Sequence, residues 1–196
     1  MMKIKKDLIL ASNSPRRKQI LTDAGFEFVV KVKPTNEDFS ETMPVNEVAA
    51  YLANKKAEAF LDEIQENQII LTADTVVVIN GQILNKPQNH NEAKSMLKLL
   101  SGQVHEVITG VCLLQKASKI AFSDIAKVYF NELSDQEIDH YIQVYKPFDK
   151  AGSYGVQDFI GMVGIPKIEG SYFTVMGLPI HRIYEELKIQ GLIVWE

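Results

Sequence analysis

The alternation of apolar and polar stretches along the chain predicts interleaved strands and helices. Short apolar runs bounded by polar or turn residues predict strands over 7–11, 26–32, 69–80, 106–115, 119–130 and most of 161–168. Stretches with apolar residues three and four positions apart predict helices over 15–24, 45–64, 91–100, 134–145 and 178–189. The segment 33–44 is polar and predicts an irregular connection.

Residues typical of turns and helix ends support this division into elements. Gly25 follows the first predicted helix and is a typical helix stop. Asn80-Gly81 is a strong signal for a two-residue hairpin, and the sequence S-D-Q-E from Ser134 matches a capping box. Because hairpins occur between alternating strands and helices, we expect an α/β fold with a mixed twisted sheet flanked by helices. Residues 1–196 would form one domain, or one domain with a small second lobe beside a central cleft.

The composition excludes several classes of protein. The chain has 196 residues, of which 46% are hydrophobic and 23% are charged, and this excludes a disordered, collagen-like or coiled-coil chain. The formal net charge of −4 argues against binding to a nucleic-acid strand. Cys112 is the one cysteine, so no internal disulfide can form. The apolar run at 8–11 is too short for a signal peptide or a membrane span, and we expect a cytoplasmic protein.

The segment S-N-S-P-R-R places two arginines in the first turn of a predicted helix. Ser14 suits the N-cap and Pro15 the first helical position. Arg16 and Arg17 oppose the positive end of the helix dipole. They would be favourable if an anion bound at this helix start, and the alternative is an exposed basic turn.

Two further charges lie in apolar surroundings. Asp74 interrupts an otherwise apolar strand, where a carboxylate is costly unless it is paired or bound to a metal. It is either a strand-end cap or a metal ligand or general base. Lys56 shares an i+4 row with Leu52 and Phe60, and it either reaches solvent or carries its charge into a cleft.

Additional charged residues extend this set. Lys86 lies in L-N-K-P, Lys150 lies in the glycine-rich segment 147–157, and Glu37 and Asp38 are acidic residues of the irregular segment. An acidic protein with such a set of cations suggests a small polyanionic substrate. Phosphate-ester chemistry assisted by a divalent metal would use both signs of charge.

Six motifs occur in an order that resembles the Maf family of nucleoside triphosphate pyrophosphatases. They are L-I-L-A-S-N-S-P-R-R-K-Q-I-L, A-D-T-V-V-V, L-N-K-P, L-S-G-Q-V-H-E-V-I-T-G-V, D-K-A-G-S-Y-G-V-Q and S-Y-F-T-V-M-G-L-P-I. The resemblance implies a fold like that of the inosine triphosphate pyrophosphatases, with Mg²⁺ or Mn²⁺ as cofactor and a homodimer as the usual assembly. It implies hydrolysis of a nucleoside triphosphate to the monophosphate and pyrophosphate.

The resemblance also implies roles for individual residues. Asp74 would be the general base, and Glu37 and Asp74 would be the metal ligands. The phosphate-binding residues would be Ser12, Arg16, Arg17, Lys56 and Lys86. The specificity residues would be Arg16, Thr75 and Gln157, which match the branch acting on dTTP and UTP, with modified pyrimidine triphosphates as further substrates. The alternatives are a 7-methyl-GTP or broad-specificity pyrophosphatase, and a nucleotide-binding regulator of septum formation.

Overall fold

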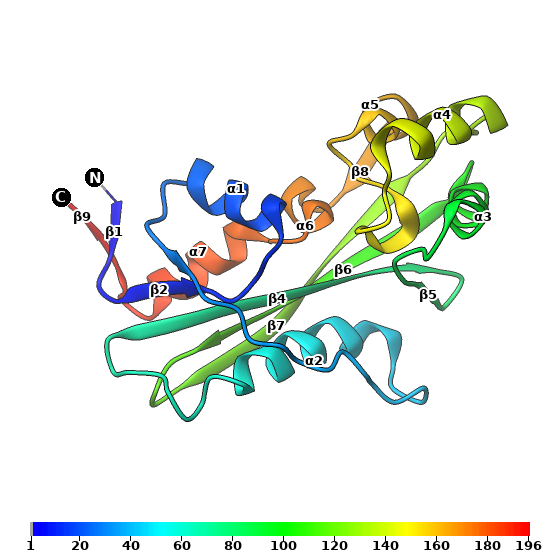
Figure 1. The fold of residues 1–196 in the computed structure, drawn as a ribbon. Coiled ribbons are helices and arrows are strands. Elements are labelled where there is room, and N and C mark those ends of the chain that lie inside the picture. The colour runs from blue at the N-terminus through cyan, green and yellow to red at the C-terminus, as the bar shows by residue number, and fades with distance from the viewer. Residues whose placement is uncertain (1) are drawn as a thin grey trace. The chain divides into compact units, whose positions relative to one another are not determined.

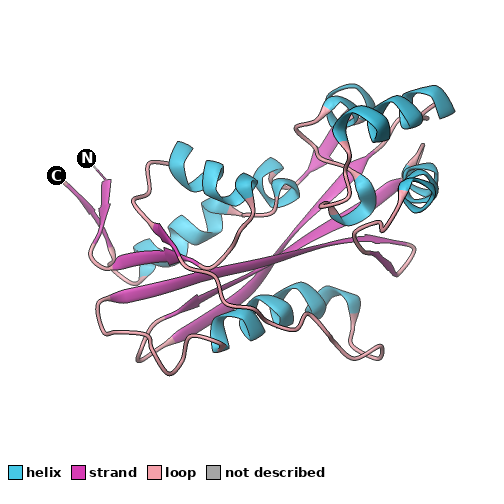
Figure 2. Cartoon of the chain, in the orientation of Figure 1, coloured by secondary structure: helices cyan, strands magenta, loops and turns pink. Residues whose placement is uncertain are grey.

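A computed structural model describes residues 2–196 and divides them into two compact units. The first unit comprises residues up to Asp74, then Thr109–Asp124 and Gly177–Glu196, and the second comprises Thr75–Ile108 and Ile125–Met176. The chain therefore passes between the units four times: within the long strands β4 (Gln68–Ile79), β6 (Val104–Leu114) and β7 (Lys119–Tyr129), and again after Met176. The elements are labelled in Figure 1 and coloured by type in Figure 2.

The other elements of the first unit lie near the two ends of the chain and in the segment before β4. They are β1 (Met2–Ile4), β2 (Asp7–Leu10), α1 (Pro15–Asp23), β3 (Val29–Val30), α2 (Val45–Glu58), α7 (Ile180–Ile189) and β9 (Ile193–Trp195). β2 pairs in parallel with both β3 and β4, and β1 pairs antiparallel with β9.

The second unit is built from short helices and hairpins. Its remaining elements are β5 (Gln82–Leu84), α3 (His90–Leu100), α4 (Asp135–Tyr145), a 3₁₀ turn (Ala151–Ser153), α5 (Phe159–Gly164), β8 (Lys167–Glu169) and α6 (Tyr172–Met176). β5 pairs antiparallel with β4, and β8 pairs antiparallel with β7. The larger sheet has the order β3-β2-β4-β6-β7-β8. Parallel and antiparallel pairs both occur, and the predicted mixed α/β fold is confirmed.

Each unit has its own apolar core. The core of the first unit contains Ala53 and Ala57 of α2 and Phe60, which follows that helix. They pack with Ile70 of β4 and Cys112 of β6. Gly110 of β6 is needed there, because a Cβ atom would overlap the backbone of Ala49 and Ala50. The helix α2 therefore lies directly on the backbone of the strand.

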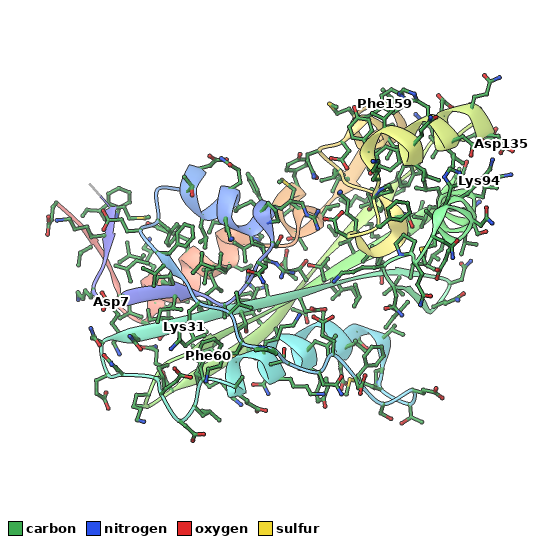
Figure 3. The ribbon with its side chains drawn as sticks, viewed as in Figure 1. Asp7, Lys31, Phe60, Lys94, Asp135 and Phe159 are labelled. Atoms are coloured by element: carbon green, nitrogen blue, oxygen red, sulfur yellow. The ribbon has the colours of Figure 1, made fainter. Side chains whose placement is uncertain are left out.

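The core of the second unit gathers side chains from β4, α3, β7 and α4, including Val77, Leu97, Val128 and Tyr141. Ion pairs link the outer faces of α3 and α4, among them Lys94–Asp139 at 2.6 Å and Lys98–Asp135 at 2.9 Å. Lys94 and Asp135 are labelled in Figure 3, each on its own helix. These contacts hold α4 beside α3.

Most predicted elements occur near their predicted bounds, with three differences. The predicted strand 26–32 is reduced to Val29–Val30, and the helix predicted over 45–64 ends at Glu58 and continues as turns. The predicted strand over 161–168 is wrong, because α5 occupies Phe159–Gly164 and only the short β8 follows. None of the helices within residues 2–196 combines the length and apolar character that crossing a membrane requires.

Candidate functional site

The turn between β2 and α1 is held by Ser12 and Arg17. The buried Ser12 hydroxyl accepts a hydrogen bond from the Ser14 backbone N–H at 3.2 Å and one from the Arg17 guanidinium at 3.3 Å. Arg17 Nε donates to the Gly177 carbonyl at 2.8 Å. Ser14 occupies the predicted N-cap position but forms no side-chain capping bond, so the hydroxyl that orders this turn is that of Ser12.

Arg17 is a cation kept in a partly buried position. Burial lowers the pKa of its guanidinium, as does the neighbouring charge of Arg16, whereas the carboxylates of Asp74 and Glu37 raise it. A guanidinium stays protonated despite such a shift. The first turn of α1 therefore places the Arg17 charge within electrostatic range of Asp74, Arg16 and Glu37.

Lys56, Asp74 and Glu37 form one charged cluster in the first unit. The Lys56 ammonium from α2 contacts the Asp74 carboxylate on β4 and lies 2.7 Å from Glu37 Oε1. Asp74 and Lys56 are largely buried, whereas the Glu37 side chain is about half exposed, at 52%. Lys56 thus carries its charge to the strand and does not simply reach solvent, and Asp74 is paired and not a turn cap.

A buried hydrogen bond fixes the separation of the two elements that carry this cluster. Thr72 precedes Asp74 by two residues and shares its face of β4. Its hydroxyl donates to the Ala53 carbonyl at 2.6 Å, one helical turn before Lys56. Together with the close approach of α2 at Gly110, this contact sets Lys56 and Asp74 opposite each other.

The cluster fits one mode of divalent-metal binding. Glu37 and Asp74 both contact the same cation, the Lys56 ammonium, so two carboxylates converge on one position. Mg²⁺ is commonly held by one or two carboxylates together with substrate phosphates and water. Within the described chain no group of three acidic, histidine or cysteine side chains gathers, so an all-protein metal cage is not formed there.

Three predicted site residues, Thr75, Lys86 and Gln157, belong to the second unit. Thr75 follows Asp74 along β4, and strand parity directs its side chain to the opposite face. Lys86 is exposed, and the carbonyl of the preceding Asn85 accepts a hydrogen bond from Gly152 at 3.2 Å. That bond ties the L-N-K-P segment to the loop before Gln157.

The glycine-rich loop is closely packed. Gly152 has φ of +67°, and a Cβ atom there would lie 2.9 Å from Val77. Lys150 was expected to add to the cationic set, but its ammonium lies 2.9 Å from Asp149 and 3.6 Å from Asp158. Its charge is therefore balanced locally.

The amide of Gln157 is an unusual feature of this loop. Its Oε1 is buried and accepts no hydrogen bond from any residue that the structure describes. A buried acceptor without a protein partner costs free energy unless water or another group satisfies it. Gln157 is one of five described residues with a buried side-chain atom that lacks a partner, and it is the one that the sequence motif assigns to substrate specificity.

A family model described as Maf-like protein matches residues 7–190. The chain belongs to the Maf family. Curated Maf relatives named dTTP/UTP pyrophosphatase include one from Phocaeicola vulgatus, 49% identical over 94% of this chain and 96% of its own length. Another, from Christiangramia forsetii, is 46% identical over 93% of each chain. The Ham1 protein of Staphylococcus aureus is a structural neighbour with TM-score 0.49 and 12% identity, over 65% of this chain and 73% of that one.

Two further residues of this Maf chain, Cys112 and His105, lie in the interior of the protein. Cys112 is fully buried, and burial raises the pKa of its thiol to about 11. His105 is also buried, and its Nε2 lies 2.7 Å from the hydroxyl of Tyr154. Sequence reasoning did not single out Tyr141 and Asp158, which contact the Gln157 loop, because they sit in an ordinary amphipathic helix and an ordinary turn.

Proposed function

We propose that this Maf-family chain is a pyrophosphatase that hydrolyses dTTP and UTP to the nucleoside monophosphate and pyrophosphate. The observation that carries the proposal is the cluster of Lys56, Asp74 and Glu37, held in one unit with Arg17. Membership of the Maf family, and curated relatives that are named dTTP/UTP pyrophosphatase, support the substrate assignment.

The cationic residues of the proposed site would bind the triphosphate. The Arg17 guanidinium is held by Ser12 and Gly177, so its orientation is set before the substrate arrives. Arg16, Lys56 and Lys86 complete the proposed phosphate-binding set. Preorganised cations stabilise the charge that develops on the leaving pyrophosphate without further reorganisation.

Asp74 is the proposed base. Its carboxylate contacts Lys56, which holds it in one orientation, and it would accept a proton from water that attacks a phosphorus atom. Glu37 and Asp74 would hold Mg²⁺ or Mn²⁺ together with the phosphates, and the ion would polarise a phosphoryl oxygen. The metal, the homodimer and the cytoplasmic location stay predictions, as does any role in septum formation.

Gln157 is proposed to read the base together with Arg16 and Thr75. Uracil and thymine present an N–H between two carbonyl oxygens, and a primary amide offers the complementary acceptor and donors. The unpartnered Oε1 of Gln157 would accept from that N–H. Cytosine has an acceptor at the same ring position and would leave the buried amide oxygen unsatisfied, which is a strong basis for rejection.

The test is pyrophosphate release from dTTP, UTP, CTP, GTP and 7-methyl-GTP, with Mg²⁺, with Mn²⁺ and with chelator. We expect metal-dependent release from dTTP and UTP, and a fall of at least about 100-fold in Asp74→Asn, because the base is removed. Asp38→Asn, at an exposed neighbouring carboxylate, is the matched control and should stay active. Wild-type turnover in Asp74→Asn would remove Asp74 as the base. Preferential release from 7-methyl-GTP would overturn the substrate, and nucleotide binding without release would indicate the regulator.

A further inference from the structure

Gln157 lies within a turn of four residues whose ends are both bound by one side chain. The backbone N–H of Asp158 donates to the carbonyl of Gly155 at 3.0 Å and closes the turn, with Gln157 at its third position. The Tyr141 hydroxyl from α4 accepts a hydrogen bond from the Gly155 N–H at 3.0 Å and donates to Asp158 Oδ2 at 2.8 Å. The Tyr141 hydroxyl therefore bonds to both end residues of the turn that contains Gln157.

Asp158 is placed where an aspartate would ordinarily cap a helix, but it does not do so. It is the N-cap of α5, yet within the described chain its side chain accepts no capping bond from that helix. The carboxylate is directed to Tyr141 and to Lys150, whose ammonium is 3.6 Å away. Because Asp is a favoured capping residue, this alternative use indicates that the contacts to Tyr141 and Lys150 matter to the loop.

Steric contacts and charges around the turn also restrict its side chains. A Cβ atom on Gly155 would lie 2.5 Å from Asp158 Oδ2 and 3.0 Å from Gln157 Nε2, so the glycine leaves room for both side chains. Burial, and next to it the charge of Asp158, raise the pKa of the Tyr141 hydroxyl. The phenol thus stays protonated and remains a donor to Asp158.

We propose that Tyr141 and Asp158 are positioning residues that orient the Gln157 amide for reading the pyrimidine base. The inference rests on the proposed function, in which Gln157 contacts the base. Tyr141 and Asp158 act through the turn and need not touch the substrate. Loosening the turn would let the amide rotate or rehydrate, and a site that discriminates by a buried hydrogen bond would lose selectivity before it loses phosphate chemistry.

The experiment compares kcat/KM for UTP and CTP, which share a ribose and triphosphate and differ in the base. We expect Tyr141→Phe to lower the UTP-to-CTP ratio by about tenfold, or about 1.4 kcal/mol, mainly through KM for UTP. Tyr145→Phe is the matched control, because it makes the same change one turn later on α4, at a partly exposed ring stacked on Tyr141. Its ratio should match the wild type.

A second pair of variants decides the matter if Tyr141→Phe does not fold. Asp158→Ala should lower the ratio, whereas Asp158→Asn keeps an acceptor for the Tyr141 hydroxyl and should restore most of it. Melting temperatures are measured for all variants. Two results would overturn the positioning role. One is a loss of kcat/KM that is equal for UTP and CTP and follows the melting temperature. The other is the same UTP-to-CTP ratio in Asp158→Ala and Asp158→Asn.

Two controls separate this inference from the proposed function. A wild-type protein that releases no pyrophosphate from dTTP or UTP would refute the function itself. An unchanged UTP-to-CTP ratio in Gln157→Ala would refute base reading by Gln157. A lowered ratio in Gln157→Ala, together with unchanged ratios in Tyr141→Phe and Asp158→Ala, would refute the positioning role alone.

Discussion

Burial of His105 makes the stability of the protein depend on pH in a defined range. The imidazole is 2% exposed, stacks on Phe130 and shares a hydrogen bond with Tyr154 at 2.7 Å. Its Nδ1 is buried and has no hydrogen-bond partner within residues 2–196. Protonation would place a charge in this apolar setting, and burial accordingly lowers the pKa of His105 from 6.5 to about 4.

The sign and size of the effect follow from this difference. The unfolded chain takes up a proton below about pH 6.5, but the folded chain does so only near pH 4, so stability is lost as the pH falls through this window. One pKa unit corresponds to about 1.36 kcal/mol, so the complete loss is about 3 kcal/mol. Between pH 7 and pH 5 the linkage relation gives about 2 kcal/mol.

Urea unfolding of the wild type and His105→Gln at pH 7 and pH 5 measures this loss. Glutamine does not titrate and keeps a polar group for Tyr154, so the difference in unfolding free energy between the two proteins should change by about 2 kcal/mol. His140→Gln, at an exposed histidine, controls for the loss of one imidazole. A difference that is the same at both pH values would refute the reasoning, because it would mean that His105 has the same pKa in both states.

Three other substitutions test the first unit. Lys56→Met should lower pyrophosphate release by at least about 100-fold, because a preorganised cation is lost. Lys55→Met is the control, because the Lys55 ammonium donates to the Asp38 carbonyl in a loop. Equal activities of the two variants would refute the role of Lys56. Gly110→Ala should lower the unfolding free energy by more than about 3 kcal/mol, because the new methyl group overlaps α2 backbone; a normal melting temperature would contradict that packing. Thr72→Val should cost about 1–3 kcal/mol in urea unfolding, because the Ala53 carbonyl loses its buried donor, and no loss would show that this bond contributes nothing.

Features encoded over a few residues were predictable from the sequence. The Asn80-Gly81 hairpin forms with φ of +51° and +76°, as two-residue hairpin turns require. The capping box at Ser134 is present with both of its hydrogen bonds. In each case neighbouring residues supply the interaction, so no knowledge of the tertiary structure is needed.

The errors occur where distant contacts decide the local structure. The run 161–168 is short and apolar, and such runs are compatible with either a strand or a buried helix. In the folded chain its first residues form a helix that is packed closely: a Cβ atom on Gly161 would overlap the Val156 carbonyl, and Ile160 is buried in the core. Neither contact has a signature in the local pattern.

In the candidate site, too, some features were predictable from the sequence and others depend on distant contacts. The placement of Lys56 and Asp74 in apolar rows marked each of them as a candidate site residue, because an isolated charge there would be costly, whereas their contact with each other is a finding of the structure. Pairing of Lys150 with Asp158, and the span of Tyr141 across the Gln157 turn, join residues eight and seventeen positions apart. These contacts became visible only in the folded chain.

The commitment of Asp158 to its neighbours has a consequence for the order in which the second unit forms. A helix of six residues without a side-chain cap has little helical tendency of its own, because nucleation costs more than so short a segment recovers. The α5 segment should therefore become ordered only after α4 has brought Tyr141 into place. By the same dependence, we expect the Gln157 turn and α5 to open together in the native protein when the Tyr141 contact breaks, which amide hydrogen exchange would measure in Tyr141→Phe.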